Sequence, residues 1–224
     1  MDKDSIVEIG YILYDTDNSN YTNFYSTLVW GKDYVYPKEV QEINGISEAL
    51  CKKKGVSPVE IFNHMNQVFQ ECDVVVAHNG LNFDRPLLYN RMSELRFFPI
   101  KRPWIDTRLD IEYDSKYTSK RLGHLAIDHG IINPMPHRAV FDAYASLMLL
   151  LKYDVRSLAV NATYPLIKIG VSPCYADNER VRNLRYFWDR DAKMWCKYIR
   201  QNSLEKELGL VQLDHKVLET GDEI

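Results

Sequence analysis

Two acidic residues and one histidine have the residue types and the spacing that a metal-dependent hydrolase needs. Asp84 ends the stretch VAHNGLNFD, and His137 and Asp142 both lie in the stretch HRAVFDAY. Carboxylate oxygens are the ligands that Mg²⁺ and Mn²⁺ prefer, and imidazole accepts a proton near neutral pH. The pattern therefore predicts a divalent-metal site beside a general base, which is typical of nucleases.

A helix is expected to position Asp142. Two prolines hold the chain extended just before His137, and apolar residues at helical spacing follow, so the helix should run from about Arg138 to about Tyr153. If His137 and Asp142 both belonged to it, they would lie about 140° apart around its axis. We therefore expect His137 on the preceding loop, folded back over Asp142.

A strand followed by a loop is expected to position Asp84. Residues 73–77 form the apolar run DVVVA, which is typical of a strand covered on both faces. The run ends at a loop that contains Gly80, and a new helix should begin near Asp84 with Pro86 in its first turn. The loop after such a strand is where α/β proteins bind ligands.

The rest of the chain alternates predicted strands and helices. Ser57 is predicted to cap a helix, with Pro58 at its first position. Residues 157–165 lack a strong pattern and are expected to link two parts of the chain. The further predicted strands are 6–14, 21–30, 104–107, 166–171, 186–188 and 194–199, and the further helices are 119–129, 177–184 and 203–208.

Composition indicates an ordinary globular protein. The 224 residues are 46% hydrophobic and 26% charged, and the net charge of -3 does not by itself indicate binding to nucleic acid. The four cysteines lack C-x-x-C spacing, so we expect reduced thiols and a cytoplasmic protein. We expect no membrane segment, because the apolar runs are too short to span a bilayer.

Three motifs in order carry a resemblance to a known family. They are HNGxxFDxP at His78–Pro86, LxxLA at Leu122–Ala126 and HRAxxDA at His137–Ala143. With the strand-like segments Ile6–Gly10 and Ile105–Thr107, they resemble the DEDDh, or DnaQ-like, 3′–5′ exonucleases. That superfamily includes polymerase proofreading subunits, ribonuclease T and TREX-type enzymes. Each motif alone is common, and their order makes the resemblance specific.

The resemblance implies a fold, a reaction and a partner. The fold would be α/β: a ribonuclease-H-like mixed sheet flanked by helices over residues 1–156, followed by a small α+β module over 163–224. The reaction would be hydrolysis of phosphodiester bonds from a free 3′ end of DNA or RNA, with single strands favoured. Two divalent cations, Mg²⁺ or Mn²⁺, would assist it.

The resemblance also implies residue roles. Asp84 and Asp142 would bind the metal ions, and His137 would be the general base. The residues implied in binding substrate or ordering its loop are Asn79, His78 and Phe83. Read from the residues alone, Asp84 is also explained as a carboxylate at a helix start, and His137 as a surface histidine. We expect a structural role for Asp106, at the end of a short strand.

One family motif has no counterpart in the given sequence. Family members carry an Asp-x-Glu pair on a central first strand, shortly before the segment that matches Ile6–Gly10. Neither Asp2-x-Asp4 nor Asp15–Asp17 falls at a matching place. We expect the gap to be filled by upstream residues or another chain, or closed by the sheet edges coming together. Val217–Thr220 echoes the motif too faintly for us to expect self-completion.

Two alternatives stay open at this point. The chain could be a pseudo-nuclease that binds nucleic acid or a protein without cutting, because the acidic pair is missing. In the small module, residues 174–200 hold seven Lys or Arg against four acids, interleaved with aromatic residues. The aromatic residues of the predicted hairpin 186–199 could stack on single-stranded bases. Alternatively, Trp188 and Trp195 could simply form the core of a very small domain, which is the interpretation we favour.

Overall fold

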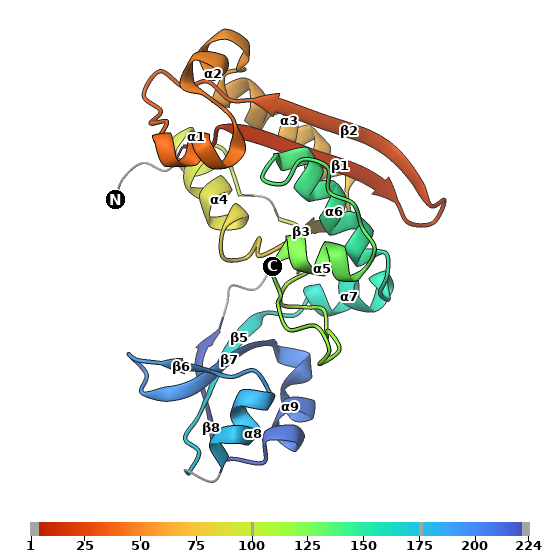
Figure 1. Ribbon diagram of the computed structural model, residues 1–224, viewed down its shortest axis with the longest axis vertical. Coiled ribbons are helices and arrows are strands. Elements are labelled where there is room, and N and C mark those ends of the chain that lie inside the picture. The colour runs from red at the N-terminus through yellow and green to blue at the C-terminus, as the bar shows by residue number, and fades with distance from the viewer. Residues whose placement is uncertain (1–4, 100, 175–176, 221–224) are drawn as a thin grey trace. The chain divides into compact units, whose positions relative to one another are not determined.

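The computed structural model describes residues 5–99, 101–174 and 177–220 (Figure 1). The chain forms two compact units, Met1–Val155 and Arg156–Ile224. Among the residues described, none of the helices is long and apolar enough to cross a membrane.

The first unit holds two separate pairs of strands. β1 (Glu8–Asp15) pairs antiparallel with β2 (Asn20–Leu28), and β3 (Val75–Ala77) pairs parallel with β4 (Trp104–Asp106). Within the described residues, no strand joins β1 to β3. The expectation that the two sheet edges come together is therefore wrong, and the sheet remains in two halves.

Burial of β3 also differs from the sequence-based expectation. Its apolar run predicts a strand covered on both faces, yet all three residues of β3 are half-buried, whereas β4 is fully buried. β3 and β4 are the two strands of one sheet, so each has a single described neighbour, and the number of neighbouring strands does not account for the difference.

Six helices surround these strands. α3 begins after Ser57, whose hydroxyl accepts a hydrogen bond from the Glu60 amide at 3.3 Å, as the capping pattern predicts. Buried residues of α3, β1, α4 and β4 form one core cluster, which includes Ile9, Phe62 and Trp104. The helices are α1 (Lys38–Asn44), α2 (Glu48–Lys54), α3 (Pro58–Glu71), α4 (Asp84–Glu94), α5 (Leu122–Asp128) and α6 (Ala139–Leu150).

The two faces of β1 contact different helices. Ile9 belongs to the core with α3, and the Tyr11 hydroxyl lies 2.7 Å from Nε2 of His64 on α3. Successive side chains of a strand point to opposite faces, so Glu8 and Gly10 share the other face, where α6 packs. A Cβ atom at Gly10 would overlap the backbone of Ala139 and Val140. Gly10 thus permits the close approach of α6 to β1.

The second unit is a four-stranded antiparallel sheet in the order β6-β7-β5-β8 (Figure 1). Its apolar core includes Ile169, Val181 and Val211 from β5, α8 and α9. The strands are β5 (Leu166–Val171), β6 (Phe187–Asp189), β7 (Met194–Arg200) and β8 (His215–Thr220). The helices are α7 (Val155–Ala162), which begins at the unit boundary, α8 (Asn178–Asn183), the 3₁₀ turn η2 (Gln201–Ser203) and α9 (Leu204–Val211).

This region differs from the sequence-based expectation in two places. Residues 157–165 were expected to be a linker, but most of them belong to α7, which buries Leu158 and Ala162. His215–Thr220, for which no strand was predicted, form β8 beside β5. β8 therefore belongs to this sheet and does not replace the missing strand. The assignment of 1–156 and 163–224 as functional domains stays a prediction.

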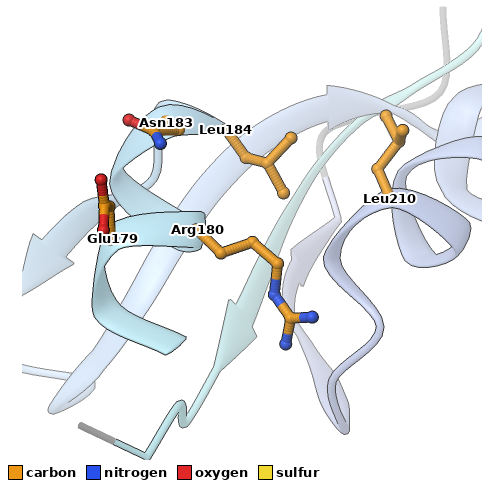
Figure 2. Close-up of a pocket in the computed structure, with 5 residues that line it drawn as sticks. All are labelled: Glu179, Arg180, Asn183, Leu184 and Leu210. Carbon is orange, nitrogen blue, oxygen red and sulfur yellow. The ribbon is translucent and has the colours of Figure 1, made fainter. Parts of the chain in front are cut away.

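A hollow of about 420 Å³ lies between α8 and α9 (Figure 2). Figure 2 shows Arg180 and Leu184 extending from α8 toward the side where Leu210 of α9 lies. Glu179 and Asn183 complete the lining. None of the predicted site residues lines this hollow, so we assign it no part in catalysis.

The fit of α6 against Gly10 gives a stability prediction. We expect Gly10→Ala to lower the free energy of unfolding by about 1–3 kcal/mol, because the added methyl group overpacks a backbone contact. Gly123→Ala is the matched control: no atom lies within 4 Å of its Cβ position in α5, so it should stabilise by about 0.5–1 kcal/mol. Urea unfolding measures both. Equal effects of the two changes would contradict the close approach.

Candidate active site

The loop between β3 and α4 is held by a buried carboxylate. Asp106, at the end of β4, is 1% exposed and accepts hydrogen bonds from the amides of Asn79 (2.8 Å), Leu81 (3.2 Å) and Arg108 (2.9 Å). Asn79 adopts a left-handed backbone conformation with φ of 65°. Asp106 therefore fixes the loop that leads to Asp84, which supports the structural role expected for it.

His78 is engaged through both ring nitrogens. Nε2 lies 2.9 Å from the carbonyl oxygen of Lys120, and Nδ1 lies 2.9 Å from the hydroxyl of Thr107. Because a carbonyl oxygen only accepts, Nε2 carries the proton and Nδ1 accepts from Thr107. Burial lowers the pKa of His78, which favours this neutral form. The ring thus holds the loop, and the substrate-binding role expected for His78 stays a prediction.

Asn79, which is half-buried, and Phe83, which is exposed, lie on the same loop. The Phe83 ring is 61% exposed at the start of α4. The Asn79 side-chain oxygen accepts a hydrogen bond from Nη1 of Arg108 at 3.0 Å. An exposed aromatic ring beside an amide group is suited to contact a nucleotide, and both roles stay predictions.

Asp84 occupies the first position of α4, as expected from the sequence. Burial raises the pKa of its carboxyl group to about 6, and the negative charges of Asp106 and Asp142 add to the increase. Its own backbone amide has the opposite effect. The charge of Asp142, in the first turn of α6, thus acts on the Asp84 carboxyl group at the start of α4.

Asp142 lies in the first turn of α6, beside His137. Burial raises the pKa of Asp142, while a hydrogen bond from Asn133 (Nδ2 to Oδ1, 2.8 Å), the His137 imidazole and the His137 amide lower it. His137 itself is exposed, has a φ of 67° and precedes the helix. The predicted arrangement, with His137 on the loop and near Asp142, is confirmed. The helix ends at Leu150, earlier than expected.

Glu8 is a site residue that sequence reasoning missed. Its side chain is 5% exposed and accepts hydrogen bonds from Nε (3.1 Å) and Nη2 (2.7 Å) of Arg138 and from the backbone amide of Ala139 (2.8 Å). Glu8 thus provides a hydrogen-bond acceptor for a free backbone amide at the start of α6, and its negative charge is balanced by the ion pair with Arg138. The available signal was a single charged residue within the apolar run IVEIGYIL.

The carboxylates suit a divalent ion, but the full predicted set of ligands is not present. Asp84 and Asp142 are close, partly buried and rich in oxygen, which fits one Mg²⁺ or Mn²⁺. No group of three or more metal-binding side chains occurs among the residues that the structure describes. The predicted two-metal site therefore needs ligands beyond Asp84 and Asp142.

Comparison with known proteins identifies the family. The family model of the RNase T exonucleases matches residues 1–150, which is more than half of the chain. The chain belongs to the RNase T exonuclease family. This family lies within the DEDDh superfamily that the sequence motifs indicate, and its members generally use divalent metals.

Relatives and solved structures agree with this assignment. The chain is 26% identical over 136 residues to the PolC-type DNA polymerase III of Mycoplasma genitalium, and 24% identical over 151 residues to that of Ureaplasma parvum serovar 3. These matches cover 58% and 62% of this chain, but the chain spans only 9% and 10% of those two proteins.

The solved structures that resemble the chain are exonucleases. In the structure of E. coli exonuclease I with a dA16 oligonucleotide, the match covers 93% of this chain and 64% of the exonuclease I chain, with a TM-score of 0.62 and 14% identity. For the same enzyme with a dT13 oligonucleotide, the match covers 74% of this chain and 44% of the other, with a TM-score of 0.56 and 18% identity. For exonuclease X with 5′ overhanging duplex DNA, it covers 70% of this chain and 91% of the other, with a TM-score of 0.50 and 20% identity. At these identities the likeness shows the fold, which is the predicted ribonuclease-H-like α/β fold.

The raised pKa of Asp84 gives a pH-dependent stability prediction. Between about pH 4 and pH 6 the unfolded carboxyl group ionises while the folded one stays protonated, so wild-type stability falls as the pH rises. We expect Asp84→Asn to stabilise by roughly 2–3 kcal/mol at pH 7.5 and by little at pH 4. Urea unfolding in EDTA measures this, with exposed Asp17→Asn as control. An equal effect at both pH values would contradict the assignment.

The Glu8 contact gives a prediction about coupling. Glu8→Gln should destabilise the protein by about 1.5–3 kcal/mol, because the amide loses the negative charge and one acceptor oxygen and places an NH₂ donor against the donors of Arg138 and Ala139. In a double-mutant cycle with Arg138→Met, the two changes should couple by at least about 1 kcal/mol. Additive effects on the free energy of unfolding would show that the Glu8–Arg138 contact does not hold α6.

Proposed function

We propose that this chain forms the core of a metal-dependent 3′–5′ exonuclease that removes nucleotides from a free 3′ end of single-stranded DNA or RNA. The observation that carries the proposal is the placement of His137 beside Asp142, together with Asp84, whose carboxyl group is influenced by the charge of Asp142. A proton acceptor next to two oxygen-rich metal ligands is the arrangement that hydrolysis of a phosphodiester requires.

Asp84 and Asp142 would hold the divalent ion, Mg²⁺ or Mn²⁺. When bound, the ion would supply positive charge to the phosphate oxygens that gain negative charge during the reaction. Burial is the first cause of the raised pKa of both carboxyl groups, and a bound cation would offset the cost of keeping two partly buried carboxylates charged.

His137 would accept the proton of the attacking water. The water oxygen would bond to phosphorus as its proton moves to the His137 imidazole. The bond from phosphorus to the 3′ oxygen of the preceding nucleotide would break, and that oxygen would take a proton from solvent to become a hydroxyl group. The exposed position of His137 lets the ring reach a water on the substrate side. The contact between Glu8 and the start of α6 would hold the short segment His137–Asp142 in place.

The loop after β3 would bind the terminal nucleotide. The exposed Phe83 ring offers a stacking surface for the terminal base, and Asn79 offers amide atoms at the same loop. We assign His78 a positioning role, because both of its ring nitrogens are used to hold the loop against Thr107 and Lys120.

A catalytically inactive nucleic-acid- or protein-binding module is the second candidate. The observation that favours it is the lack of a third metal-binding side chain near Asp84 and Asp142 among the described residues. In an active enzyme, a strand carrying Asp-x-Glu would fill the space between the open edges of β1 and β3. Upstream residues of the same polypeptide or another chain would supply this strand.

The two candidates are separated by restoring the missing strand. We expect a protein extended upstream by an Asp-x-Glu strand to show Mn²⁺-dependent shortening of a 5′-labelled oligonucleotide from its 3′ end. The control is the same extension with Asn-x-Gln, which can pair with β1 without adding carboxylates. Full activity of the 224-residue chain alone, as a homogeneous monomer, would show that the pair is not essential.

Substitutions test the residue roles in whichever of these proteins is the more active. Asp142→Asn should abolish the Mn²⁺-dependent shortening, and His137→Ala should lower its rate by about 10²–10⁴-fold with metal binding largely retained. Asp128→Asn and His124→Ala, on exposed positions of α5, are the matched controls. Unchanged rates in both site variants would remove these residues from the mechanism.

A further inference from the structure

The second unit carries an exposed tryptophan beside a cationic group. Trp188 of the edge strand β6 is 51% exposed, and its ring centre lies 6.0 Å from that of Trp195 on the neighbouring strand β7. The guanidinium of Arg182, from α8, lies 5.6 Å from the Trp195 ring centre. Trp195 packs against the core, whereas Trp188 does not belong to it. The expectation that both tryptophans are core residues is therefore wrong for Trp188.

Three exposed arginines accompany this tryptophan. The described residues give the guanidinium groups of these arginines no ion pair or hydrogen bond with a carboxylate. Two of them lie within three residues of Trp188 along the chain, and the third contacts its partner ring. They are Arg182, Arg185 and Arg190.

Two of the nearby acidic groups are already paired with cations. Asp177 pairs with Arg180 at 2.6 Å, on the part of α8 that Figure 2 shows beside the hollow. Asp189 pairs with Lys168 at 2.8 Å. Against the exposed carboxylates of Glu179 and Asp191, the three arginines still leave an excess of positive charge near Trp188.

The opposite face of β6 has a different character. Phe187 is 43% exposed, but its ring stacks on Tyr198 with centres 5.9 Å apart. Lys168 belongs to this face and is paired with both Asp189 and Glu219. Two adjacent aromatic residues of one strand thus lie on faces that differ in charge.

We propose that Trp188, Arg182, Arg185 and Arg190 form a contact surface for single-stranded nucleic acid, with the Trp188 ring stacked on a base and the arginines on phosphates. Stacking on an aromatic ring requires an unpaired base, and guanidinium groups bind phosphates through several donors. The inference rests on the proposed function for the nature of the ligand, but the surface itself needs neither metal nor catalysis. We call these four residues the Trp188 surface.

Base stacking is tested with the full chain in EDTA, so that no cleavage occurs. Binding of a fluorescein-labelled oligo-dT is followed by anisotropy. We expect Trp188→Ala to weaken binding by about fivefold or more, Trp188→Phe to retain most of the affinity, and Phe187→Ala to leave it unchanged. Equal losses in Trp188→Ala and Phe187→Ala, or equal affinity of wild type for a blunt DNA duplex, would overturn the stacking.

Phosphate contact is tested by the salt dependence of the same binding. Replacing Arg182, Arg185 and Arg190 together by Gln should reduce the slope of log K against log salt by about 2, since each phosphate contact to a single strand contributes about 0.7. The matched control replaces the exposed residues Lys52, Lys53 and Lys54 of α2 together by Gln, which also removes three positive charges. An equal reduction in the control would overturn the surface. Asp142→Asn separates the two proposals: it should abolish exonuclease activity and leave oligo-dT binding in EDTA unchanged.

Discussion

The contact between Glu8 and the start of α6 is the interaction on which the candidate site depends. One buried carboxylate accepts hydrogen bonds from Arg138 and from the Ala139 amide, and so ties β1 to the helix that carries Asp142. Gly10, on the same face of β1, allows the helix to approach closely enough for this contact. The position of His137, one residue before Arg138, follows from the same attachment.

The divided sheet explains why this contact matters. Within the described residues β1 and β3 have no common neighbour, so hydrogen bonds between strands do not fix Asp84 relative to Asp142. α6 contacts both β1 and β3, and Asp106 holds the loop that leads to Asp84. Side chains and helix packing therefore bring the two carboxylates together in a sheet that lacks its central strand.

Local signals in the sequence predicted most of the first unit and the residues of the site. The Ser57 cap, the start of α4 at Asp84 and the loop position of His137 depend on a few neighbouring residues, and the structure confirms them. The pairing of β8 with β5 depends on a strand far away in the chain, which local patterns do not report. Glu8 was missed for the same reason, because its partners lie about 130 residues later.

Binding of Mn²⁺ to the purified protein tests the central claim most directly, because it asks whether Asp84 and Asp142 form one metal site. Isothermal titration at pH 7.5 should show a site in the wild type whose affinity falls by about tenfold or more in both Asp84→Asn and Asp142→Asn. The exposed Asp17→Asn variant should bind as the wild type does. Equal Mn²⁺ affinity in all four proteins would contradict the account.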